Sequence, residues 1–168
     1  MEEKLKSVRW GSLLAILTIL FGFSIGVIMG GAEEAIKHYW KELAQPGLAT
    51  LYQNDPQKIT ALVDRCWRML LRAHLHGAAI GTAMLILNFV LACLNVGEQM
   101  KKWASLALGL GGLGYACSWL LVAFQAPVVG SIPAAKATIH LLAAPSIALM
   151  FFGVAVVLVF GVKTLFKK

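Results

Sequence analysis

The feature that most constrains this chain is a series of four long, mainly apolar stretches. They cover about residues 10–31, 69–94, 103–124 and 135–162. A helix needs about 20 such residues to cross the hydrocarbon of a bilayer, which is about 30 Å thick. Because lipid offers no hydrogen-bond partner to the backbone, each stretch is expected to form an α-helix. The sequence therefore predicts an all-α integral membrane four-helix bundle, with residues 1–168 forming a single membrane domain.

The composition agrees with a membrane protein. Hydrophobic residues make up 59% of the 168 residues and charged residues 14%, whereas soluble domains average about 25% charged residues. The net charge is +7, but many of the basic residues flank the apolar stretches, where they face lipid headgroups. No basic stripe with interleaved aromatic residues occurs, so nucleic-acid binding is not expected. Membrane lipid is the expected surroundings and partner.

A polar segment, residues 32–66, separates the first two apolar stretches. Glu33 and Lys37 are spaced i,i+4, which favours a short amphipathic helix over residues 32–44. Asp55 followed by Pro56 is typical of a helix start, so the next helix is expected to begin there and continue into the membrane. We therefore expect an amphipathic extramembrane helical segment between the first and second membrane helices.

The basic residues predict the orientation of the bundle. The N-terminus, the loop 97–102 and the C-terminus lie on one side of the membrane if there are four spans. These three parts contain Lys4, Lys6, Arg9, Lys101, Lys102, Lys163, Lys167 and Lys168. The positive-inside rule then places both termini in the cytoplasm, in a bacterial inner membrane. The first stretch resembles a signal peptide, but it is longer than the usual apolar core of about 7–15 residues, so an uncleaved helix is preferred over cleavage.

Few ionisable side chains fall inside the predicted spans, and function in membrane proteins tends to depend on such residues. They are Arg72, His74, His76 and His140. At a rise of about 1.5 Å per residue, the three histidines and Ser118 lie about 8–11 Å from the outer ends of their helices. These residues are therefore expected in one layer of the outer leaflet, and a site is expected there.

The helical periodicity separates His74 from His76. The two side chains are about 200° apart on a helix, so they cannot both bind one metal ion from a regular helix. His74 shares its face with Gly77 and Gly81, a small-residue surface that suits helix packing. His76 is expected to face the outer segment, lipid headgroups or a partner. His140 also has small neighbours on its face.

A haem b site is the leading interpretation of this layer. Two neutral imidazoles from different helices at one level can ligate a low-spin haem iron, so His74 and His140 are the predicted ligands, with His76 as the substitute. Arg68, Arg72 or Lys136 would pair with the propionates. The chain is then expected to be a small redox subunit that passes electrons between a quinol pool or partner and a periplasmic acceptor, rather than a stand-alone enzyme.

The stretch Arg72–Gly77 resembles the histidine-bearing helices of haem-copper oxidase and b-type cytochrome subunits. This resemblance covers six residues and implies haem ligation by a histidine of that stretch. The chain departs from the oxidase pattern because it lacks the helix count and the copper-ligand histidines of the oxidase core.

Several alternatives remain open. A histidine, an arginine and Ser118 can hydrogen-bond a quinone, so a quinone-binding subunit with or without haem is one alternative. A cofactor-free structural or assembly subunit is another, since histidines also form simple interhelical hydrogen bonds. A metal site that includes His38 and a transport function are weaker alternatives. Other membrane or periplasmic redox subunits are the expected partners, and a homo-oligomer is an open possibility.

Overall fold

The structure, a computed structural model, describes residues 2–166 and is helical over most of them. The helices, in chain order, are α1 Glu2–Lys6, α2 Arg9–Ala44, the short 3-10 helix η1 Gln45–Gly47, α3 Pro56–Cys93, α4 Glu98–Val129 and α5 Ile132–Leu165. Within the described residues there is no strand. The prediction of an all-α four-helix bundle is confirmed.

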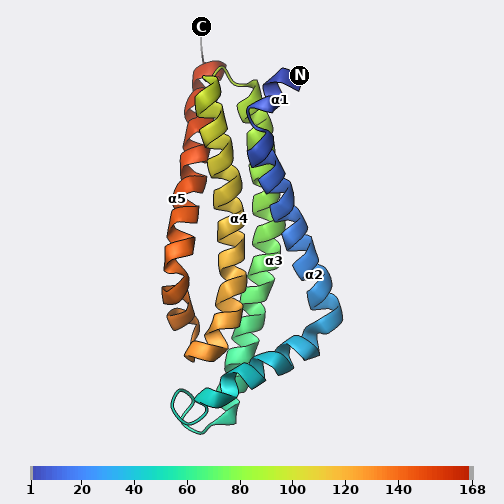
Figure 1. Cartoon of the computed structure of the whole chain (residues 1–168), viewed down its shortest axis with the longest axis vertical. Helices are drawn as coiled ribbons and strands as arrows, with labels where there is room; N and C mark the ends of the chain where they lie inside the picture. Colours follow the sequence, from blue (N-terminus) through green and yellow to red (C-terminus); the bar gives the residue numbers. More distant parts are fainter. Residues whose placement is uncertain (1, 167–168) are drawn as a thin grey trace.

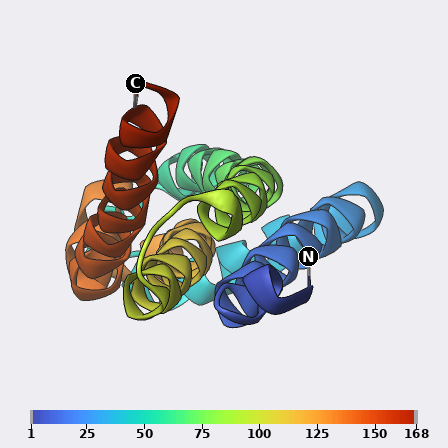
Figure 2. The same ribbon diagram turned by 90° about the horizontal axis from the view of Figure 1, so that it is seen from above.

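The four long helices lie side by side, with α4 at the centre (Figure 1). Both termini lie at one end of the bundle, which we call the terminal end. The segment around η1 lies at the other end, which we call the loop end. Seen from above, α4 lies between α5 on one side and α2 on the other (Figure 2). Helices α3 and α5 have little direct contact, so α4 joins α5 to the rest of the bundle.

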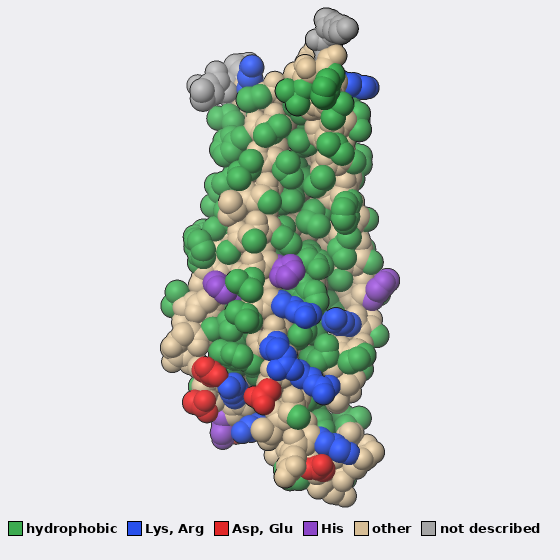
Figure 3. All heavy atoms as spheres, turned by 180° about the vertical axis from the view of Figure 1, so that it is seen from behind, with side chains coloured by type: hydrophobic (Ala, Val, Ile, Leu, Met, Phe, Trp, Pro, Cys, Tyr) green, Lys and Arg blue, Asp and Glu red, His purple; other side chains and the backbone are tan. Residues whose placement is uncertain are grey.

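Four helices, α2, α3, α4 and α5, are long and apolar enough to cross a membrane, which makes the chain an integral membrane protein. On the face shown in Figure 3, apolar side chains cover most of the surface toward the terminal end, and lysines and arginines gather nearer the loop end. Helix α3 continues after Arg72 without Asp, Glu, Lys or Arg for 21 residues, 73–93. That length is about 32 Å, close to the hydrocarbon thickness. Arg72 therefore lies at the border of the hydrocarbon rather than inside it.

The predicted amphipathic helix over residues 32–44 is present as the second part of α2. It runs from a bend at Ala32 to Ala44. Ala32 has non-helical backbone angles, φ −136° and ψ 23°, and bends α2 at this point. The second part of α2 then crosses toward the loop end of the bundle (Figure 1).

Aromatic packing holds this second part of α2 in place. Trp40 is completely buried, and its ring lies 5.5 Å from that of Phe124 in α4 and 6.4 Å from that of Trp67 in α3. Trp40 is therefore a core residue. The amphipathic segment covers the loop end of the bundle.

The connections between the last three helices are shorter than the sequence suggests. Helix α4 already begins at Glu98, so most of the expected loop 97–102 forms its first turn. At the other end α4 includes Pro127 and continues to Val129, and α5 begins at Ile132. Gly130, which has a φ of 82°, ends α4 in the left-handed conformation that glycine adopts readily. This tight turn fixes α5 close to α4.

Glycines permit the close approach of the helices. A Cβ atom added to Gly77 of α3 would lie 2.7 Å from the Cα atom of Gly22 in α2. One added to Gly111 of α4 would lie 2.6 Å from the carbonyl oxygen of Ser146 in α5. Such small-residue contacts let helix backbones touch in a membrane. The glycine-rich part of α4 therefore serves helix packing, as its place inside a span indicates.

Candidate functional site

His74 lies in the interface between α3 and α2. Its Nδ1 atom is 2.8 Å from the carbonyl oxygen of Gly22, at hydrogen-bonding distance. A Cβ atom on Gly26 would lie 2.6 Å from Cε1 of the ring, so the glycine makes room for the imidazole. The small-residue face of α3 thus points to α2, and His74 is one of the groups that join these two helices.

His140 lies elsewhere, on the exposed surface of α5. It lines a cavity of about 240 Å³ between α4 and α5. The lining also includes Tyr115, Ser118, Trp119, Val122, Lys136, Ile139, Ala143 and Ile147. We call this cavity the α4–α5 pocket. His74 does not line it, so the structure does not bring the predicted pair His74 and His140 together.

Trp119 is the residue around which the site is built. The guanidinium carbon of Arg72 lies 5.0 Å from the centre of its ring, and the ammonium nitrogen of Lys136 lies 5.1 Å from it. Arg72 comes from α3, Trp119 from α4 and Lys136 from α5, so one indole joins cations from the two flanking helices. Each such cation–π contact stabilises by about 0.5–1 kcal/mol when exposed and more when desolvated.

His76 packs against the same aromatic residues. Its ring centre lies 5.5 Å from that of Tyr115 and 5.6 Å from that of Trp119. Its Nδ1 atom lies 2.8 Å from the carbonyl oxygen of Arg72, one turn earlier in α3. His76 therefore faces α4, whereas the sequence suggested that it faces lipid headgroups, the outer segment or a partner. It contacts the Trp119 ring without lining the pocket.

Three polar groups of the pocket retain hydrogen-bonding capacity. Ser118 donates its hydroxyl proton to the carbonyl oxygen of Tyr115 over 2.7 Å, which leaves its oxygen able to accept. The indole nitrogen of Trp119 is buried and has no hydrogen-bond partner among the described residues. A buried donor without a partner is costly, by about 1–3 kcal/mol, and this nitrogen is covered by protein atoms rather than open to the pocket. His140 has no polar or ring contact within residues 2–166 and is available to a ligand.

These residues do not fit a haem held by two histidines. His74 is engaged with Gly22 at the α2–α3 interface. Of the alternative pair, His140 lines the α4–α5 pocket, whereas His76 packs against Tyr115 and Trp119 and does not line it. The cavity volume of about 240 Å³ is also below the range of about 300–1,000 Å³ that is typical for drug-sized ligands.

The alternative metal site has no support in the structure. Among the described residues, no three His, Cys, Asp or Glu side chains come close enough to hold a metal ion together. His38 lies beyond the bend of α2, with its Nδ1 atom 3.6 Å from a carboxylate oxygen of Glu42. It is remote from the α4–α5 pocket and takes no part in it.

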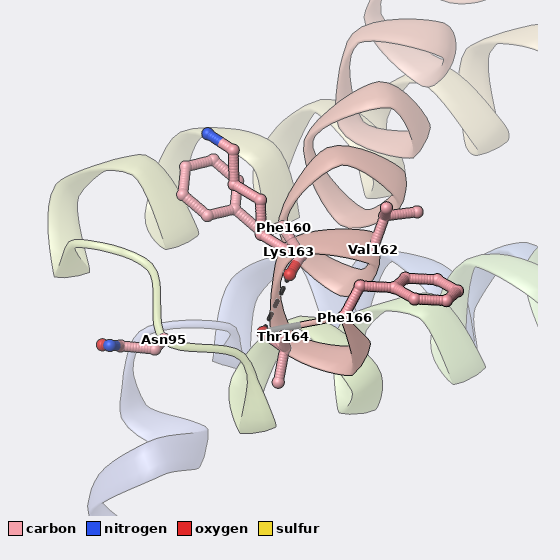
Figure 4. Close-up of a pocket in the computed structure, with 6 residues that line it drawn as sticks. All are labelled: Asn95, Phe160, Val162, Lys163, Thr164 and Phe166. Atoms are coloured by element: carbon pink, nitrogen blue, oxygen red, sulfur yellow. Dashed lines mark hydrogen bonds between the residues drawn. The ribbon is translucent and has the colours of Figure 1, made fainter. Parts of the chain in front are cut away.

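A larger hollow, of about 620 Å³, lies at the terminal end but makes a poor site (Figure 4). Apart from Asn95, its lining comes from the last turns of α5, so few elements converge on it. The hydroxyl of Thr164 is already used, because it donates to the carbonyl oxygen of Phe160 over 2.8 Å. Figure 4 shows Phe166 and Val162 directed away from Asn95. The α4–α5 pocket is the better candidate.

Sequence reasoning missed Tyr115 and did not place Trp119 among the predicted site residues. A signal was present, because Tyr115, Ser118, Trp119 and Val122 are spaced three or four residues apart and share one face of α4. Lys136 was considered only as a partner for propionates, and the structure places it over Trp119 instead.

The fold and this site define a four-helix integral membrane protein with an amphipathic pocket between two of its spans. A comparison with known protein families, curated proteins and solved structures finds no match for the chain.

Proposed function

We propose that this chain is a membrane subunit that binds a quinone or quinol in the α4–α5 pocket. The observation that carries the proposal is the environment of Trp119, which has two cations over its ring. A quinone is a flat ring with carbonyl oxygens, so it matches an aromatic wall beside a cationic donor. Lys136 and His140 are exposed on the bundle surface, which makes the pocket accessible from the lipid side.

The pocket lining suits the two ends of such a ligand. Val122, Ile139 and Ile147 provide apolar surface for ring methyl groups and for the start of an isoprenoid tail. Lys136 offers a donor to a carbonyl oxygen, and it becomes a stronger partner if the oxygen gains negative charge on reduction. The site lies near the hydrocarbon border at the level of Arg72, a depth that the headgroup of a lipid-soluble quinone can reach.

The chain's own contribution to redox chemistry would be binding and proton exchange. Oxidation of a quinol to a quinone releases two electrons and two protons. His140 is the imidazole on the pocket lining and is the group suited to exchange a proton with the ligand. The electrons would pass to or from a partner redox subunit. If both termini are cytoplasmic, as the basic residues indicate, the pocket faces the periplasmic side of a bacterial inner membrane.

Quenching of tryptophan fluorescence by decylubiquinone, a short-chain quinone, tests the proposal. In detergent, we expect saturable quenching of the wild-type protein and a smaller saturable amplitude in Trp119→Phe. Trp103→Phe is the matched control, because Trp103 is exposed in the first turns of α4, at the terminal end. His140→Ala should keep the amplitude and weaken the apparent affinity by about fivefold, the loss of one hydrogen bond of about 1 kcal/mol.

Other outcomes would separate the alternatives. Non-saturable quenching that is equal in Trp119→Phe and Trp103→Phe would refute the quinone site and favour a cofactor-free structural or assembly subunit. A Soret band in protein produced with adequate haem, absent in His140→Ala, would favour the haem interpretation instead. A stoichiometric phospholipid in the pocket that decylubiquinone does not displace would also count against quinone binding.

A further inference from the structure

We propose a second binding site, for a phosphate group, in a basic cavity at the terminal end of the bundle. Two adjoining hollows, of about 210 Å³ and 580 Å³, share Lys6, Ser7, Arg9 and Lys102 in their linings. Lys4 adds a further cation to the larger hollow. This basic cavity lies where α1 meets α2 and against the first turns of α4, remote from the α4–α5 pocket. It is independent of quinone binding.

The walls of the basic cavity are held in a fixed arrangement. The hydroxyl of Ser105 in α4 donates to the carbonyl oxygen of Val8 over 3.0 Å, at the α1–α2 junction. Gly11 packs against the backbone oxygen of Ser105 so closely that a Cβ atom would clash with it. Ser7 is buried and donates its hydroxyl proton to the carbonyl oxygen of Lys4 over 3.2 Å. The junction that carries Lys4 and Arg9 is therefore fastened to the helix that carries Lys102.

The charge of the cavity selects an anion. The cations Lys4, Arg9 and Lys102 line the two hollows, against one carboxylate, Glu98. That carboxylate lies 3.6 Å from the ammonium nitrogen of Lys101, which offsets its charge. The acidic residues near the start of the sequence are Glu2 and Glu3. Cations that are held together at a membrane surface attract anionic headgroups, by about 1 kcal/mol for each lysine or arginine.

The chemistry of the lining points to a phosphate rather than to a quinone. Lysine and arginine side chains are the usual ligands of phosphate oxygens, and several of them can share one phosphate. Trp10 lines the smaller hollow, is 57% exposed, and lies with its ring 5.4 Å from the guanidinium carbon of Arg9. An exposed tryptophan beside a cation is typical of the headgroup level. An anionic phospholipid can therefore place its phosphate in the basic cavity and its acyl chains along α2 and α4.

Native mass spectrometry of the detergent-solubilised full chain tests this site. With added phosphatidylglycerol, we expect the wild-type protein to retain one lipid more tightly than it retains phosphatidylcholine. Lys102→Gln should lower the phosphatidylglycerol affinity by about fivefold, the effect of one surface cation. Lys163→Gln is the matched control, because it removes one positive charge at the same end of the bundle but outside the basic cavity.

Equal affinities of Lys102→Gln and Lys163→Gln for phosphatidylglycerol would overturn the proposal, because the attraction would then come from net charge alone. Equal binding of phosphatidylglycerol and phosphatidylcholine would overturn it as well. A third arm uses inorganic phosphate without lipid. If phosphate raises the unfolding temperature of the wild-type protein and of Lys163→Gln but not that of Lys102→Gln, while no lipid is retained, the site takes a soluble phosphate instead of a headgroup. Circular dichroism of each variant in phosphatidylcholine micelles confirms that the fold is intact.

Discussion

The imidazole of His74 in α3 lies 2.8 Å from the carbonyl oxygen of Gly22 in α2. That contact joins two spans and directs His74 away from the α4–α5 pocket. It also separates the roles of the histidines: His74 is structural, His76 supports the Trp119 ring, and His140 faces the pocket.

Replacement of His74 by alanine should therefore affect stability and not ligand binding. The loss of one interhelical hydrogen bond should cost about 0.6 kcal/mol on average, and at most about 1.7 kcal/mol. Thermal unfolding in detergent, followed by circular dichroism, measures this loss. Quenching by decylubiquinone should be unchanged in His74→Ala and weakened in His140→Ala, and the reverse pattern would show that His74 belongs to the binding site.

Replacement of Arg72 by glutamine should weaken quinone binding through Trp119. The cation–π contact at 5.0 Å positions the indole and is worth about 0.5–2 kcal/mol, so the apparent dissociation constant should rise by about two- to thirtyfold. Arg68→Gln is the matched control, since Arg68 lies about one turn earlier on α3 and is exposed, without a cation–π contact to Trp119. If both variants bind decylubiquinone equally, the Arg72–Trp119 contact does not shape the site.

The close contact of α2 and α3 at Gly77 predicts a large response to one added methyl group. In Gly77→Ala, the new Cβ atom would lie 2.7 Å from the Cα atom of Gly22, and relief of this clash should cost about 1–3 kcal/mol. In Gly30→Ala the new methyl meets nothing within 4 Å, so the unfolding temperature should not fall. Thermal unfolding of the two variants should therefore differ, and equal unfolding temperatures would mean that the helices can separate at no cost.

Tyr52, in the connection between η1 and α3, should make the stability of the protein depend on pH under alkaline conditions. Its hydroxyl donates to the carbonyl oxygen of Pro127 over 2.6 Å, and burial, with a smaller effect of Cys66, raises the pKa of Tyr52 above its usual value of 10.0. A raised pKa means that the folded protein holds the phenol proton more tightly than the unfolded chain does. The stabilisation is therefore complete below pH 10 and is lost as the pH rises through the pKa of the folded state.

Comparison with Tyr52→Phe isolates this contribution. Near neutral pH the variant should be less stable than the wild type by about 1 kcal/mol, the value of one hydrogen bond. Above pH 10 the difference between the two should shrink, because the wild type then also loses the bond. Tyr39→Phe, at an exposed position, should show no such convergence. If the difference in stability between the wild type and Tyr52→Phe stays constant with pH, ionisation of the phenol does not destabilise the fold.

The sequence predicts the four spans well because hydropathy acts over whole helices. A stretch of 20 or more apolar residues has few stable alternatives in lipid, so the number of spans does not depend on any single side chain. The start of α3 was equally predictable, because Asp55 and Pro56 form a local helix-start signal. In the structure, Asp55 accepts a hydrogen bond from the backbone N–H of Gln57 over 2.9 Å.

The partners of each helix face were much harder to predict. Periodicity shows that His74 and His76 point in different directions, but not which helix lies in either direction. The sequence favoured a pairing of His74 with His140 because both have small neighbours, whereas the small residues beside His74 serve the contact with α2. The order of the helices around α4 decides the outcome, and that order depends on packing over the whole bundle.

The number of residues between the bend of α2 at Ala32 and the buried Trp40 is constrained by the fold. Beyond the bend the helix is regular, so eight residues lead from Ala32 to Trp40, which must arrive facing Phe124 and Trp67. Each added or removed residue in this stretch would turn Trp40 by about 100° around the helix axis. Substitutions on the exposed side of the stretch leave that angle unchanged, whereas a single insertion or deletion swings the indole out of the core. The length of this stretch is therefore under tighter constraint than its composition.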